Sequence, residues 1–152
     1  MFNIPVTYPT PEEEAEIVRS TTSTQQLSAD SILSAEEIIR LQDLVRGVPV
    51  ANDVIDYAVA LVGFSRPETS DFDKDVHRFI RYGASPRASQ YLILGAKARA
   101  LLAGRFHVDF SDVAAVAVPV IRHRIVLNFH ARAEGIDADE IVRRLVKKVK
   151  HR

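Results

Sequence analysis

The sequence predicts an all-α protein, a helical bundle with one strand at its N-terminus. Two patterns lead to this prediction. Apolar residues recur at helical spacing along most of the chain, and cap and stop residues divide it into segments of helical length. Strict alternation of apolar and polar residues occurs only in residues 2–8. With 152 residues, 47% of them apolar, the chain can bury one core.

Residues 2–8 have the period of a strand, with four apolar residues on one side. These are Phe2, Ile4, Val6 and Tyr8. No second convincing strand follows, so the backbone donors and acceptors of this strand would stay unpaired. We therefore expect its sheet to lie in a segment that precedes this chain.

A first helix is expected directly after this strand. Thr10 is its predicted N-cap and Pro11 its first residue. Glu12–Glu14 are interpreted as acidic residues at the positive end of the helix dipole and not as metal ligands. Residues 20–31 are rich in Ser and Thr and are interpreted as a polar linker.

Two further helices are predicted before residue 63. Ser34 and Glu37 form a capping box for the first, and the second begins near Asn52. Their predicted buried faces are Ile38, Leu41, Val45 and Val48 in the first, and Val54, Ala58, Leu61 and Val62 in the second. Residues 63–75, which contain Pro67, are predicted to form a loop.

The clearest helix signals flank residues 86–103. Ser85 is the predicted N-cap, Pro86 the first residue and Gly104 the stop. Gly95 inside this helix costs about 1 kcal/mol relative to Ala, so we expect close packing there. The predicted buried face is Tyr91, Leu94, Ala98 and Leu101.

Two more helices complete the prediction. Asp109-x-x-Asp112 begins one that Pro119 should kink or end, and Asp137-x-x-Glu140 begins the last. Ile141, Leu145 and Val149 should be the buried residues of the last helix. Periodicity leaves residues 125–129 open between helix and strand.

Residues 83–89 (GASPRAS) contain the main candidate site, because a basic side chain stands at a helix start. A helix N-terminus attracts anions and disfavours cations. A bound anion would explain Arg87, since an ion pair of about 4 kcal/mol at about 4 Å outweighs a dipole penalty of about 0.3–1 kcal/mol. The guanidinium supplies planar donors that suit phosphate. The alternative is an arginine that extends into solvent.

Other charged groups have simpler explanations. The histidines lack metal-ligand spacing, and the segment 122–124 (RHR) either assists Arg87 or complements a helix C-terminus. The basic last helix is interpreted as a solvated face. The histidines are His77, His107, His123, His130 and His151, and the basic residues of the last helix are Arg143, Arg144, Lys147, Lys148, Lys150 and Arg152.

Composition argues against several classes of function. Twenty Lys and Arg balance twenty Asp and Glu, whereas a nucleic-acid-binding domain normally has an excess of positive charge. The chain has no cysteine, which excludes disulfides and thiolate chemistry and fits a reducing compartment. No signal peptide or run of about 18 apolar residues is found. We expect a cytoplasmic protein that binds neither nucleic acid nor membrane.

The segment 83–89 resembles the sensor 2 segment of MoxR-family AAA+ ATPases. The resemblance extends over nearly the whole chain and is weakest in residues 20–31 and 63–75. The other similar segments are 2–9 (FNIPVTYP), 32–38 (ILSAEEI), 41–42 (LQ), 48–50 (VPV), 53–61, 65–66 (SR), 104–108 (GRFHV), 122–125 (RHRI) and 133–136 (AEGI).

This resemblance implies a domain division and a role for the candidate site. Residues 1–19 would end the AAA+ core, 20–33 would be the linker and 34–152 the helical lid. Arg87 would contact the γ-phosphate of ATP bound with Mg²⁺ in the parent protein, with Ser85 and Pro86 beside it. The family implies a hexameric ring ATPase that acts as a chaperone, often with a von Willebrand factor A-domain partner.

The chain by itself lacks the other parts of an ATPase. It has no GxxxxGK[ST] motif and no hydrophobic run that ends in paired acids, so it encodes no complete active site. We expect ATPase activity only of the parent, joined to its core, and no tightly bound cofactor in this fragment. The alternatives are a non-enzymatic helical interaction module and, more weakly, a nucleic-acid module that uses the last helix.

Overall fold

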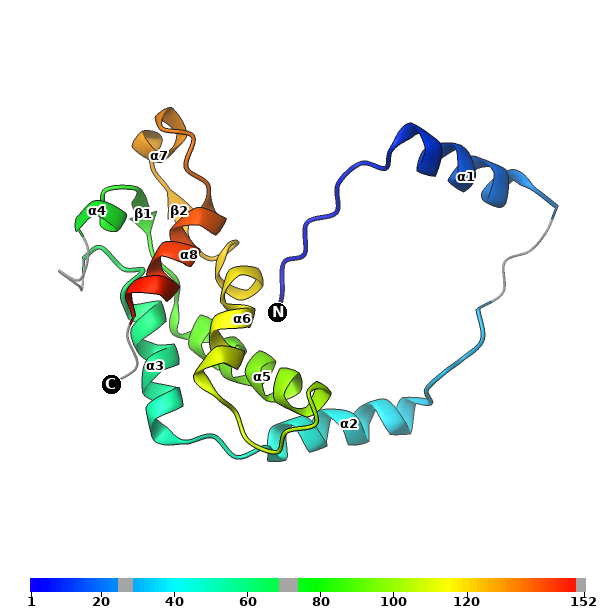
Figure 1. Cartoon of the computed structure of the whole chain (residues 1–152), viewed down its shortest axis with the longest axis horizontal. Coiled ribbons are helices and arrows are strands. Elements are labelled where there is room, and N and C mark those ends of the chain that lie inside the picture. The colour runs from blue at the N-terminus through cyan, green and yellow to red at the C-terminus, as the bar shows by residue number, and fades with distance from the viewer. Residues whose placement is uncertain (25–28, 69–73, 150–152) are drawn as a thin grey trace.

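The computed structural model describes residues 1–24, 29–68 and 74–149, and it confirms the predicted all-α class. The helices and strands follow one another in chain order (Figure 1). They are α1 (Pro11–Thr22), α2 (Ala35–Gly47), α3 (Asn52–Gly63), α4 (Lys74–His77), β1 (Ile80–Tyr82), α5 (Pro86–Leu102), α6 (Phe110–Ile121), β2 (Val126–Leu127), α7 (Phe129–Ala133) and α8 (Ala138–Lys148).

The bundle is built around α5. This helix packs against α6 and α3, and α6 in turn packs against α8. The core between them is aliphatic, and its largest fully buried side chains include Phe79, Leu61, Leu92, Ile141 and Leu145. The N-terminal segment and α1 extend away from the bundle, and α2 leads from the bundle back toward α1 (Figure 1).

The predicted helix starts are confirmed by their capping hydrogen bonds. The side chains of Thr10, Ser34, Asp109 and Asp137 stand at the N-caps of α1, α2, α6 and α8, and each accepts a hydrogen bond from a backbone N–H of its helix. At α2, for example, the Glu37 N–H donates to Ser34 Oγ at 3.2 Å. Cap residues act over a few positions, which is why sequence reasoning found them.

The predicted N-terminal strand does not form within this chain. Residues 1–10 have no strand structure, because no strand of the described residues lies beside them to pair with their backbone. The described residues instead form one small antiparallel sheet from β1 and β2, with Ile80 opposite Leu127 and Tyr82 opposite Val126. Within the ambiguous segment 125–129, a strand thus comes first and α7 begins at Phe129.

Two of the predicted buried faces were largely wrong. Helix α2 buries none of its residues: Ile38 is 45% exposed and Leu41 is 47% exposed, and of the predicted face only Val48, the C-cap, is buried. In α5 the fully buried side chains are Ala88, Leu92, Ala96 and Ala100, whereas the predicted face is only half-buried. Because apolar and small residues occur all around α5, its periodicity does not select one face. The faces predicted for α3 and α8 are confirmed.

Two smaller predictions need adjustment. Residues 20–22, which were assigned to the linker, continue α1, and the Thr21 hydroxyl donates to the Ile17 carbonyl at 2.6 Å. Pro119 does not end α6, which continues to Ile121. Parts of the predicted linker and loop, residues 25–28 and 69–73, lie outside the described residues, as do residues 150–152.

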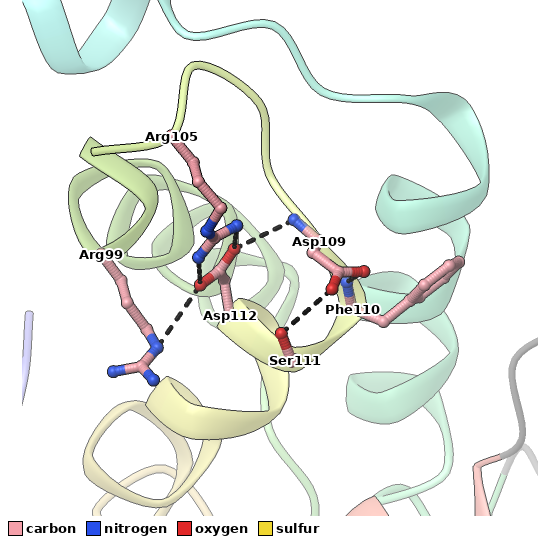
Figure 2. A network of polar contacts seen from close by, with 6 residues as sticks. All are labelled: Arg99, Arg105, Asp109, Phe110, Ser111 and Asp112. Atoms are coloured by element: carbon pink, nitrogen blue, oxygen red, sulfur yellow. Dashed lines mark hydrogen bonds and ion pairs between the residues drawn. The ribbon is translucent and has the colours of Figure 1, made fainter. Parts of the chain in front are cut away.

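A buried carboxylate joins the end of α5 to the start of α6 (Figure 2). The Asp112 side chain is 1% exposed and accepts two hydrogen bonds from the Arg105 guanidinium, at 2.6 and 2.8 Å. The Asp109 N–H donates to the same carboxylate at 3.0 Å, and Arg99 Nε lies 3.4 Å from it. This network fixes the turn between the two central helices of the bundle.

The charge of Asp112 is expected to stabilise the fold in a pH-dependent way. Hydrogen bonds from Arg105 lower the pKa of Asp112, although its burial opposes this effect. We expect Asp112→Asn to lower the free energy of unfolding by about 2–3 kcal/mol at pH 7. A group with a lowered folded-state pKa stabilises above its unfolded pKa of about 3.9, and this contribution disappears as pH falls through the folded pKa.

Urea unfolding of both forms between pH 7 and pH 3 measures this effect. The difference in unfolding free energy between the wild type and Asp112→Asn should shrink in acid. Asp56→Asn is the control, because Asp56 is exposed on α3, and it should change stability little at any pH. A difference for Asp112→Asn that is constant with pH would contradict the assignment.

Candidate functional site

The N-terminus of α5 differs from the capped helix starts described above. Ser85 occupies the N-cap with an extended backbone, but its hydroxyl makes no capping hydrogen bond. Pro86, the first helical residue, has no N–H to donate. The first turn of α5 therefore keeps the positive end of its dipole without a protein acceptor at the cap.

The loop before α5 is clamped to the end of α3. The fully buried Ser65 hydroxyl donates to the Val62 carbonyl at 2.6 Å and accepts from the Ala84 N–H at 2.9 Å. Arg66 Nε donates to the Ala84 carbonyl at 2.8 Å. Gly83 lies so close to Ser65 that an added Cβ would be 2.4 Å from the Ser65 carbonyl oxygen. These contacts fix the direction in which α5 begins.

Arg87 projects from this fixed helix start. Its side chain is exposed, and it has no hydrogen bond or ion pair with any residue in the described part of the chain. A cation in the first turn of a helix is disfavoured by the dipole, and no carboxylate among the described residues offsets the cost. The arrangement is suited to an anion that both the guanidinium and the helix N-terminus can face.

The structure separates the basic segment 122–124 into different roles. Arg122 forms an ion pair with Asp139 at the start of α8, so its charge is already neutralised. Arg124 lies over the Tyr91 ring, with its Cζ 5.1 Å from the ring centroid, and Tyr91 is one helical turn after Arg87. Of the two arginines, Arg124 thus reaches the face of α5 that carries the candidate site.

His123 adds little positive charge to this region near neutral pH. Burial, the neighbouring Arg124 and the N-terminal amino group all lower the pKa of its imidazole. Among the other predicted histidines, His77 Nε2 lies 2.8 Å from the Phe64 carbonyl, a contact within the fold. Within the described ranges, no group of three His or acidic residues is arranged to hold a metal ion.

Two basic residues of α8 form local ion pairs. Arg143 pairs with Asp139 and Arg144 with Glu140, each at a spacing of four residues. These pairs agree with a solvated helix face. In the part of the chain that the structure describes, no helix has the length and apolar character needed to cross a membrane.

A cleft of about 360 Å³ was not predicted from the sequence. It lies beside the edge-to-face pair of Tyr57 and Phe110, whose ring centroids are 5.5 Å apart. The cleft is lined by Tyr57, Asp109, Phe110, Ser111, Ala114 and Val146. These residues come from three separate helices, so no local motif indicates the cleft. It contains none of the predicted site residues.

Comparisons with known proteins agree with the helical fold described above. Residues 73–145 match the family model described as AAA lid domain. The chain is 37% identical over 149 residues to Chaperone MoxR1 of Mycobacterium tuberculosis. This match covers 98% of this chain and 39% of that protein. It is 50% identical over 64 residues to Protein MoxR of Paracoccus denitrificans, or 41% of this chain and 19% of that protein.

A solved structure supports the same fold. The crystal structure of a candidate ATPase from Cytophaga hutchinsonii superimposes with a TM-score of 0.84 at 30% identity. The match covers 99% of this chain and 46% of that chain. The present chain thus spans less than half the length of MoxR1 and of this structure.

The helical fold and these matches define an AAA lid domain. The similar proteins indicate a narrower group than the domain match does, because two of them are MoxR proteins. The chain is similar to MoxR proteins over nearly all of its length, as the resemblance of residues 83–89 and their neighbours predicted.

The clamp before α5 can be tested by filling the space at Gly83. Gly83→Ala is expected to lower the free energy of unfolding by about 2 kcal/mol or more, because the new methyl group meets backbone atoms of Ser65 that cannot rotate away. Urea unfolding followed by circular dichroism measures this change. Gly63→Ala is the matched control, since an added Cβ there meets no atom within 4 Å. Equal stability of the two variants would show that the clamp is loose.

Proposed function

We propose that this chain is the lid of a MoxR-like AAA+ ATPase and that Arg87 acts as its sensor 2 arginine. The observation that carries the proposal is the exposed Arg87 guanidinium at a helix start whose N-cap side chain makes no hydrogen bond. In this role Arg87 contacts the γ-phosphate of ATP. Ser85 and Pro86 form the helix start beside the nucleotide.

The chemistry of phosphoryl transfer explains why such an arginine matters. Negative charge is spread over the oxygens of the transferred phosphoryl group in the transition state, and catalysis depends on positioned positive charge. A guanidinium offers two parallel N–H donors and stays protonated at physiological pH. The clamp formed by Ser65 and Gly83 would hold this donor in place without reorganisation.

The remaining parts of the ATP site are assigned to an AAA+ core. The described residues fit a phosphate contact, but they offer no cluster of ligands for Mg²⁺. We therefore assign the binding of Mg²⁺ and the attacking water to the core, and one phosphate contact to this chain. Movement of the lid would then change the distance between Arg87 and the nucleotide.

Exposed apolar side chains support the proposed contact with a core. In the N-terminal segment, Val6 is 92% exposed and Tyr8 is 99% exposed. On α2, Ile39 and Leu44 are 59% and 56% exposed. Large exposed apolar side chains in such number are typical of segments that contact another domain. The domain division at residues 1–19, 20–33 and 34–152 belongs to the same proposal.

The proposal extends to the assembly. We place the protein in the cytoplasm as a homo-oligomeric ring, a hexamer, that remodels protein complexes. A von Willebrand factor A-domain protein is the proposed partner. These assignments rest on the family, whose members in the comparison include a protein named as a chaperone.

Mutation of Arg87 in the chain joined to its core tests the sensor 2 role. Arg87→Ala is expected to lower kcat for ATP hydrolysis by about 10²-fold, because the transition state loses a charged donor. Arg87→Lys should recover only part of the rate, since it keeps the charge but loses the planar pair of donors. Steady-state phosphate release measures both variants.

Arg132→Ala is the matched control. Arg132 is also exposed, but it lies in α7 and outside the candidate site. It should leave kcat and KM close to those of the wild type. Unchanged kcat and KM in Arg87→Ala would remove the assigned role.

A further inference from the structure

One face of α5 connects the candidate site with the N-terminal segment. Arg87, Tyr91 and Gly95 are spaced four residues apart, so they follow one another along the same side of the helix. Phe2 lies against Gly95: a Cβ added there would be 2.7 Å from Phe2 Cζ and 3.1 Å from Phe2 Cε1. Glycine is thus required for the phenyl ring to approach α5 this closely.

Two hydrogen bonds hold the segment on either side of this ring. The Asn3 N–H donates to the Pro119 carbonyl of α6 at 2.8 Å. Arg124 Nη1 donates to the Met1 carbonyl at 3.2 Å. Three independent contacts, from α5, α6 and the turn after α6, therefore fix residues 1–3 to the bundle.

The exposure of the apolar side chains shows where this attachment ends. Phe2 is 38% exposed, whereas Ile4 is 74% and Val6 is 92% exposed. Only the start of the segment is thus seated on the bundle. Beyond Asn3 the segment runs away from the bundle toward α1 (Figure 1).

Arg124 joins this attachment to the Arg87 end of α5. The same guanidinium that holds the Met1 carbonyl lies over Tyr91, and Tyr91 is one turn from Arg87. Contacts therefore continue from Phe2 and Met1, through Gly95 and Arg124, to the helical turn that follows Arg87. No acidic residue in the described part of the chain forms an ion pair with Arg124.

We infer that Phe2 and Gly95 form a latch that fixes the segment of residues 1–3 to α5, and that they are positioning residues for Arg87. The latch sets how the helix that carries Arg87 lies relative to the segment that leads into α1. The attachment itself is independent of any nucleotide. Its effect on hydrolysis rests on the proposed sensor 2 role of Arg87.

Hydrogen exchange in the 152-residue chain tests the attachment. The amide of Asn3 should exchange at least about tenfold more slowly than that of Val6, because only the Asn3 amide bonds to the bundle. Phe2→Ala and Gly95→Ala should each bring the Asn3 amide to the rate of Val6. NMR exchange spectra give both rates in one sample.

The two variants differ in their risk to folding. Gly95→Ala adds a methyl group that meets the end of a movable side chain, so Phe2 should be displaced while α5 persists. Phe2→Ala leaves the helix unchanged. Gly47→Ala is the matched control, because an added Cβ in α2 meets no atom within 4 Å, and it should keep the Asn3 protection. An Asn3 amide as fast as Val6 in the wild type would overturn the latch.

ATP hydrolysis by the chain joined to its core tests the effect on Arg87. Both latch variants should lower kcat by about tenfold with KM nearly unchanged, since they misplace a group that acts in the transition state. Phe2→Leu, which keeps an apolar side chain, should restore most of the rate. In an Arg87→Ala background the latch variants should have no further effect.

The outcomes separate the two proposals. If Arg87→Ala does not change hydrolysis, the sensor 2 role fails, and the latch is judged by the exchange of the Asn3 amide alone. If Arg87→Ala lowers kcat but Phe2→Ala and Gly95→Ala do not, the positioning role of the latch is overturned. Additive effects of Arg87→Ala and Gly95→Ala would also overturn it.

Discussion

The close packing of α5 is the constraint on which the rest of this structure depends. Its small buried residues, Ala88, Ala96 and Ala100, allow α3 and α6 to approach from two sides. Both ends of the helix are then fixed by buried polar contacts. Ser65 holds the loop before it, and Asp112 holds the turn after it. A helix held in this way can present a side chain at its N-terminus in a defined direction.

The electrostatics of that N-terminus are the basis of the proposed contact with a phosphate group. Some other arginines are neutralised within the chain, as Arg105 is by Asp112 and Arg122 by Asp139. Arg87 is exposed, and its first turn lacks a capping side chain. A phosphate group would satisfy both features together, which no carboxylate of residues 1–24, 29–68 or 74–149 does.

The two ends of the chain differ in how far they are packed. From α3 onward, the aliphatic residues of the helices close into one core. Before α3, most apolar residues of the N-terminal segment, α1 and α2 stay exposed, although Val48 after α2 is buried and Phe2 lies against Gly95. This difference agrees with the proposal that the outer parts face another domain. Phe2 attaches the N-terminal segment to the bundle, and α2 packs against α5.

The amino-acid sequence by itself determined the class of fold, most helix starts and the chemistry of the candidate site. Those features depend on residues within a few positions of one another, such as Ser34 with Glu37, or Arg87 with the start of its helix. The need for close packing at Gly95 was also visible, because glycine is unfavourable inside a helix.

Only the tertiary structure decided which residues meet across long distances in the chain. It placed Phe2 on Gly95, paired β1 with β2, chose the buried face of α5 and left α2 exposed. The period of residues 2–8 predicted a strand, but a strand also needs a partner, and none lies beside it. Local propensity shapes single helices, whereas burial and strand pairing depend on the neighbours that the whole fold provides.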